Sequence, residues 1–144
     1  MKASVAVALV ALVVSLAGTS QAQSFFSSPD RYKTVDTDKL TRNYLRGLSC
    51  GNEGVIESAM AQAVMAKLMR PEEEFEPLQT KLEALSVSGP TQAIRYKAYL
   101  ASTVFANPTM FTGERTTNYP DGEALFTALA MRLQQTLTAS NEAR

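Results

Sequence analysis

Histidine is absent from the 144 residues, and Cys50 is the only cysteine. The lack of imidazole excludes Ser-His-Asp and Cys-His catalysis and the most common zinc ligand sets. A single cysteine excludes a disulfide within the chain. Because Cys50 follows Leu48 at the end of a predicted helix, in an apolar neighbourhood, we expect a buried, inert thiol, and a thiol that pairs with another molecule is the alternative. We expect neither enzymatic activity nor a bound metal or cofactor.

The chain also lacks an excess of charge of either sign, since 14 basic residues balance 14 acidic ones. Proteins that bind nucleic acids or anionic membranes neutralise phosphates with clustered lysine and arginine. The one acidic run, Glu72–Glu74, adjoins a predicted helix start, where the helix dipole favours carboxylates. The charge balance therefore argues against a nucleic-acid partner.

The first 22 residues have the order of a secretory signal peptide. Lys2 is their only charged residue, and residues 3–17 are almost entirely Ala, Val and Leu. Ser20 and Ala22 place small residues at the positions that signal peptidase recognises. The apolar run is shorter than the about 20 residues that span a membrane. We predict cleavage after Ala22 and export to the periplasm or the medium without a membrane span, and a retained anchor is the alternative.

Apolar residues in the rest of the chain recur at helical spacing, without the alternation that is typical of strands. Leu40, Tyr44 and Leu48, for example, share one helical face. Glycine, proline and N-capping residues separate the periodic segments. The pattern predicts an all-α fold with about five helices, over approximately residues 37–50, 52–70, 76–87, 91–106 and 121–138. The second helix has a broad, Ala-rich apolar arc, so we expect it to be central.

The remaining segments lack sustained periodicity. Residues 23–36 predict a flexible tether, in which Phe25 and Phe26 either dock on the domain or are exposed. The helical domain then extends over residues 37–139, and residues 140–144 predict a frayed tail. Residues 107–120 predict a loop that is longer than the usual helix–helix connection, and such loops often carry binding residues.

Two predicted helix pairs share a pattern. Leu-x-x-Leu-Ser at 45–49 recurs 37 positions later at 82–86, and Pro71 recurs at the same offset as Pro108. Over about residues 37–108 this resembles the HEAT and armadillo class of α-helical repeats. The resemblance implies a short stack of antiparallel helical hairpins with a protein- or peptide-binding surface. A plain bundle of antiparallel helices is the alternative arrangement.

The long predicted loop and one face of the fourth helix supply the candidate interaction residues. These residues are Met110, Phe111, Arg115, Tyr119, Arg95 and Tyr99. We expect Arg95 to form an interhelical ion pair with Glu57. The leading interpretation is an exported, non-enzymatic interaction or scaffold module that binds a protein or peptide. The alternative is a carrier of a small apolar ligand between the helices, which a pocket lined by Met60, Met69 and Phe105 would favour.

Overall fold

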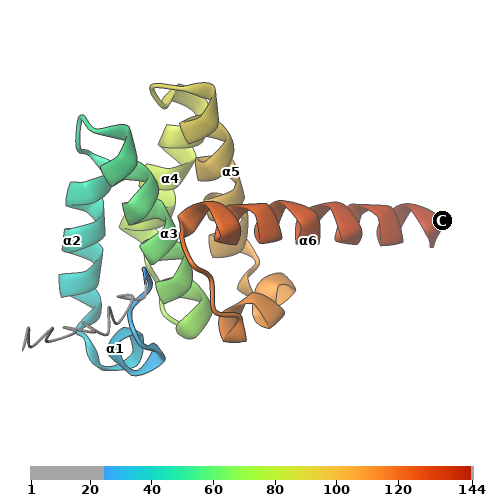
Figure 1. Ribbon diagram of the computed structural model, residues 1–144, viewed down its shortest axis with the longest axis horizontal. Helices are drawn as coiled ribbons and strands as arrows, with labels where there is room; N and C mark the ends of the chain where they lie inside the picture. Colours follow the sequence, from blue (N-terminus) through green and yellow to red (C-terminus); the bar gives the residue numbers. More distant parts are fainter. Residues whose placement is uncertain (1–24, 144) are drawn as a thin grey trace, which may run out of the picture.

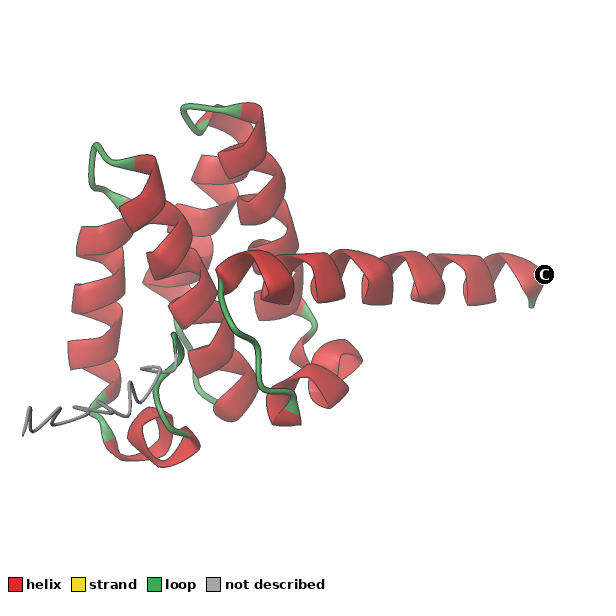
Figure 2. Ribbon diagram, in the orientation of Figure 1, coloured by secondary structure: helices red, strands yellow, loops and turns green. Residues whose placement is uncertain are grey.

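The computed structural model describes residues 25–143, so the predicted signal peptide lies outside the described residues. The prediction of an all-α fold is confirmed, because residues 25–143 form six α-helices, one 3-10 helix and no strand (Figure 2). None of these helices combines the length and the apolar character that are needed to cross a membrane. In chain order the elements are α1 (Pro29–Thr34), α2 (Thr37–Leu48), α3 (Glu53–Met69), α4 (Glu76–Ser88), α5 (Gln92–Ala106), η1 (Pro108–Thr116) and α6 (Gly122–Glu142) (Figure 1).

Helix α3 is the centre of the domain, as its Ala-rich sequence predicts. The Asn52 side chain caps it by accepting a hydrogen bond from the Val55 amide at 3.1 Å. Most of α3 is buried, and α1, α2, α5, α6 and η1 all contact it. Small residues permit this crowding: a Cβ at Gly47 of α2 would lie only 2.6 Å from the Ala59 Cβ of α3.

Helices α4 and α5 pack along one another, and their predicted apolar faces lie in the core. Leu78, Leu82 and Leu85 of α4 are buried. Ile94, Ala98 and Phe105 are among the buried residues of α5, which begins where the Thr91 side chain accepts a hydrogen bond from the Ile94 amide. The helical period in these two segments therefore identified the residues that hold the domain together.

The segment before α2 differs from the predicted flexible tether. Phe26 is buried, and Tyr32 on the short helix α1 is only 1% exposed. The Gln62 side chain of α3 donates a hydrogen bond to the Phe25 carbonyl oxygen at 2.7 Å. Pro29 at the start of α1 sets a helical φ angle, but a helix of six residues is too short to show an apolar period. Aromatic burial therefore anchors residues 25–36 to the domain.

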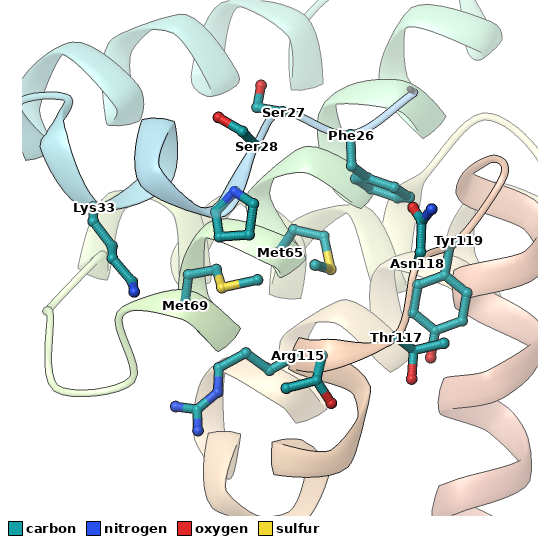
Figure 3. A pocket seen from close by; sticks show the side chains of 12 residues that line it. Phe26, Ser27, Ser28, Lys33, Met65, Met69, Arg115, Thr117, Asn118 and Tyr119 are labelled. Atoms are coloured by element: carbon teal, nitrogen blue, oxygen red, sulfur yellow. The ribbon is translucent and has the colours of Figure 1, made fainter. Parts of the chain in front are cut away.

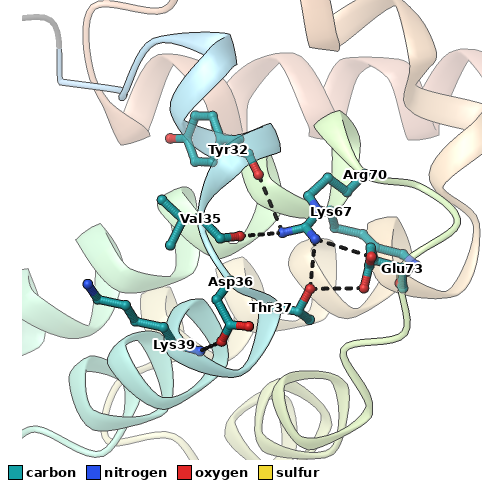
Figure 4. Close-up of polar contacts among 8 residues, drawn as sticks. All are labelled: Tyr32, Val35, Asp36, Thr37, Lys39, Lys67, Arg70 and Glu73. Atoms are coloured by element: carbon teal, nitrogen blue, oxygen red, sulfur yellow. Dashed lines mark hydrogen bonds and ion pairs between the residues drawn. The ribbon is translucent and has the colours of Figure 1, made fainter.

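Arg70, at the end of α3, ties this segment down (Figure 4). Its Nη1 donates to the Val35 carbonyl oxygen at 3.0 Å, and its Nη2 donates to Thr37 Oγ1 at 2.7 Å. Glu73 lies 3.2 Å from Nη2 and balances the charge. One guanidinium group thus connects the link between α1 and α2 to the turn that follows α3.

Cys50 is exposed, so the expectation of a buried thiol is wrong. The neighbouring Leu48 does point into the core and is buried. The turn between α2 and α3 faces solvent, because Ser49, Cys50, Gly51 and Asn52 are all exposed. The apolar residues near Cys50 in the sequence therefore do not surround its side chain.

The predicted loop over 107–120 contains the 3-10 helix η1, and Phe111 anchors this helix in the core. Asp121 then caps α6 by accepting a hydrogen bond from the Ala124 amide at 2.8 Å. Helix α6 continues to Glu142, past the start of the predicted frayed tail. Figure 1 shows that its outer half extends away from the other helices.

Candidate ligand-binding cleft

The candidate interaction residues do not form one surface. Phe111 and Tyr119 are buried, whereas Tyr99 is exposed on α5. Arg95 donates a hydrogen bond to the Gly89 carbonyl oxygen at 2.8 Å, in the connection between α4 and α5. Half-buried Met110 presents its carbonyl oxygen to Arg132 of α6 at 3.2 Å. These contacts stabilise the domain.

The expected ion pair between Glu57 and Arg95 is replaced by a different one. Lys97 Nζ lies 3.0 Å from Glu57 Oε1 and 2.6 Å from Glu123 Oε2. Because Arg95 bonds back to the Gly89 carbonyl, the lysine two positions further along α5 is the cation that reaches α3 and α6. This cluster joins three helices and has a structural role.

A cleft with a volume of about 780 Å³ lies between the N-terminal segment, the end of α3 and the segment after η1 (Figure 3). We call it the methionine cleft. Its lining residues are Phe26, Ser27, Ser28, Pro29, Lys33, Met65, Met69, Arg115, Thr116, Thr117, Asn118 and Tyr119. Of the candidate residues, only Arg115 and Tyr119 belong to it.

The apolar surface of the cleft comes from two helical turns of α3 and from two aromatic rings. Met65 and Met69 are four residues apart, so they share one face of α3. The rings of Phe26 and Tyr119 pack edge to face, with centroids 6.5 Å apart. Methionine side chains are flexible and polarisable and adapt to ligands of different shape. This surface suits an apolar chain or ring.

The Tyr119 hydroxyl donates a hydrogen bond to Glu114. Burial and this hydrogen bond raise the pKa of Tyr119 to about 12. The phenol therefore stays neutral and keeps its proton on the bond to Glu114 at physiological pH. Because its hydroxyl is already used, Tyr119 contributes mainly its ring to the cleft.

Two cations lie on the rim. Lys33 comes from α1 and Arg115 from the end of η1, and both are exposed. Neither forms an ion pair with another residue of the range 25–143. No carboxylate occurs among the described residues that line the cleft, whereas serine and threonine hydroxyl groups do. The rim is therefore electropositive and rich in hydrogen-bonding groups.

The pocket expected between Met60, Met69 and Phe105 is not formed by these residues together. Met60 is fully buried, Met69 lines the methionine cleft, and Phe105 lines a different and smaller pocket beside Phe75. The sequence did not identify the N-terminal segment as a wall of this cleft, although docking of Phe25 and Phe26 on the domain was one of the two expectations for these residues.

No family model, curated protein or solved structure matches this chain significantly.

Proposed function

We propose that this chain is an exported, non-enzymatic binding protein that holds a small amphipathic ligand in the methionine cleft. The observation that carries the proposal is a cleft of about 780 Å³ with a continuous apolar floor, Met65 and Met69, beside two aromatic rings. Ligand sites in proteins have volumes of roughly 300–1,000 Å³ and combine apolar walls with a few polar groups. The methionine cleft has both properties.

The proposal revises the position of the ligand in the carrier interpretation. Half-buried Met69 lies at the end of α3, and Met65, which is 4% exposed, forms the deeper part of the cleft wall, between the N-terminal segment and the segment after η1. A ligand in this position displaces water mainly from the Met69 side chain. Burial of apolar area contributes roughly 25 cal/mol per Å², which is enough for micromolar binding of a molecule with a long apolar chain.

The test is titration of the purified protein with N-phenyl-1-naphthylamine, a neutral dye whose fluorescence rises in apolar surroundings. We expect saturable binding by the wild type and at least about tenfold weaker binding by Met69→Glu, since a carboxylate on the floor opposes burial of an apolar group. Met69→Gln should weaken binding less. Val87→Glu on α4 is the matched control, because Val87 is 81% exposed and lies outside the cleft.

Two results would contradict the proposal. The first is a wild-type protein that shows no saturable binding of the dye. The second is equal binding by the wild type, Met69→Gln and Met69→Glu. Circular dichroism of each variant establishes that the fold is retained, and Met69→Gln provides the comparison if Met69→Glu does not fold.

The second candidate is the interaction or scaffold module, and the outer half of α6 supports it. Met131 and Leu137 of this helix are 56% and 59% exposed. Residues 133–141 contain no charged side chain. An isolated helix that lacks ion pairs between residues four apart is marginal in water, so packing against another molecule would stabilise it.

We propose a second copy of the chain as this partner, because antiparallel pairing of identical helices brings the same uncharged segment of each copy together. The HEAT-like stacking remains part of this candidate, supported by the packing of α2 along α3 and of α4 along α5. Sedimentation equilibrium tests it: the wild type should dimerise, Leu137→Glu should be monomeric, and Val87→Glu should behave as the wild type. A wild type that stays monomeric up to about millimolar concentration rules this candidate out.

A further inference from the structure

We infer that the ligand of the methionine cleft is a long-chain monocarboxylate. In this arrangement Lys33 and Arg115 bind the carboxylate, and the apolar chain lies along Met69 and Met65. The inference rests on the proposed function of the cleft and adds the chemical class of the ligand.

Polarity changes along the length of the cleft. Figure 3 shows the cationic ends of Lys33 and Arg115 at one end of it and the rings of Phe26 and Tyr119 toward the other, with both methionines between them. A ligand with one charged end and one apolar end therefore matches the cleft in a single orientation. A ligand that is apolar throughout would leave the cationic end unused.

The two cations have the chemistry that a carboxylate requires. Arginine presents several N–H donors in a planar fork that matches both carboxylate oxygens, and lysine adds a compact positive charge. Neither Lys33 nor Arg115 is neutralised by another residue within 25–143. They come from α1 and η1, which are far apart in the sequence, so the fold itself brings both of them to this cleft.

The opposite end of the cleft disfavours a second anionic group. The Tyr119 hydroxyl is already bonded to Glu114, whose carboxylate would repel another carboxylate there. Asn118 and the aromatic rings are the neighbouring lining groups, and none of them carries a charge. A dicarboxylate therefore fits less well than a monocarboxylate, and a cationic amphiphile would meet like charge at Lys33 and Arg115.

The experiment is displacement of bound N-phenyl-1-naphthylamine by dodecanoate, dodecanol and dodecyltrimethylammonium, each below its micellar concentration. We expect dodecanoate to bind the wild type at least about tenfold more tightly than dodecanol, and the ammonium compound to bind more weakly than either. The double variant Lys33→Gln with Arg115→Gln should lose the preference for dodecanoate and keep its affinity for dodecanol. The preference should also decrease at high salt concentration.

The matched control is a double variant that also removes one lysine and one arginine. It combines Lys81→Gln on α4 with Arg46→Gln on α2. Neither residue lines the cleft, so this variant should retain the full preference for dodecanoate.

The inference is wrong, while the proposed function stands, if the wild type binds dodecanoate and dodecanol equally. The same holds if the double variant of Lys33 and Arg115 binds both compounds more weakly by the same factor. If a short apolar peptide with a free C-terminal carboxylate binds more tightly than dodecanoate, the ligand class is wrong. If none of these compounds nor the dye binds, the proposed function fails as well.

Discussion

The Tyr32 hydroxyl donates a hydrogen bond to the side-chain oxygen of Gln62, and this bond joins the N-terminal segment to the central helix α3. Burial of the Tyr32 ring raises the pKa of its hydroxyl, so that the group remains a donor at physiological pH. The same Gln62 side chain holds the Phe25 carbonyl oxygen at 2.7 Å. The segment that forms one wall of the methionine cleft is therefore fixed to the helix that forms its floor.

Replacement of Tyr32 should destabilise the whole domain. Tyr32→Ala removes a ring that is 1% exposed, and we expect the free energy of unfolding to fall by about 3–5 kcal/mol. Tyr32→Phe retains the ring and deletes only the hydrogen bond to Gln62, so a loss of about 1 kcal/mol is expected. Urea denaturation followed by circular dichroism measures both values.

The control is Tyr96→Ala, because Tyr96 is 54% exposed on α5. It should change the free energy of unfolding by less than about 1 kcal/mol. If Tyr32→Ala were as mild as this control, residues 25–36 would not belong to the cooperative unit, and the N-terminal wall of the cleft would lose its support.

Removal of the Arg70 side chain should release the N-terminal segment. Arg70→Ala deletes the donors to the Val35 carbonyl oxygen and to Thr37, and we expect a loss of about 2 kcal/mol. Exchange of the amide hydrogens in residues 25–36 should become faster than exchange in α4 and α5. Hydrogen exchange with mass spectrometry separates these regions.

Arg46→Ala is the comparison for this variant, since Arg46 is an exposed arginine on α2. It should leave exchange in residues 25–36 unchanged. Equal protection of this segment in Arg70→Ala and in the wild type would mean that aromatic burial alone holds it in place.

The long helices were predictable because their burial follows a local pattern. Leu78, Leu82 and Leu85 recur at helical spacing and are buried in the structure. Asn52 and Asp121 are capping residues whose side chains accept the expected hydrogen bonds. In each case the residues that decide the structure lie within one or two helical turns of one another.

The cleft could not be predicted in this way, because its walls come from distant parts of the chain. Phe26 and Tyr119 meet only after α1 and η1 dock on α3. The 3-10 helix η1 is anchored by the single buried residue Phe111, which produces no period. Cys50 shows that apolar neighbours in the sequence do not ensure burial. Leu48 points into the core, whereas Cys50 is exposed.

The Lys97 cluster should make stability dependent on alkaline pH. Burial lowers the pKa of Lys97, but the hydrogen bonds to Glu123 and Glu57 outweigh burial and raise it above the ordinary value of 10.5. A raised pKa means that the stabilisation is complete below the pKa of the unfolded chain and is lost as the pH rises through the higher folded value. The difference in free energy of unfolding between the wild type and Lys97→Met should therefore be largest at neutral pH and shrink as the pH rises above the ordinary lysine pKa of 10.5.

At pH 7 we expect Lys97→Met to lose about 1–2 kcal/mol, because two carboxylates then face each other without a cation. Adding Glu57→Gln and Glu123→Gln to this variant should recover part of the loss. Lys81→Met on α4 serves as the control in the same urea titrations. A difference that is independent of pH up to about pH 12 would show that Lys97 acts through packing and not through its charge.

The outer half of α6 should unfold independently of the core in the monomer. Thr136, Thr138 and Ser140 bond back to carbonyl oxygens four residues earlier, and these residue types have low helix propensity. Replacing all three by alanine should slow amide exchange in residues 136–142. The free energy of global unfolding should change by less than about 0.5 kcal/mol, because this half of the helix projects from the body (Figure 1). A global change above about 1 kcal/mol would instead place the whole of α6 in the cooperative unit.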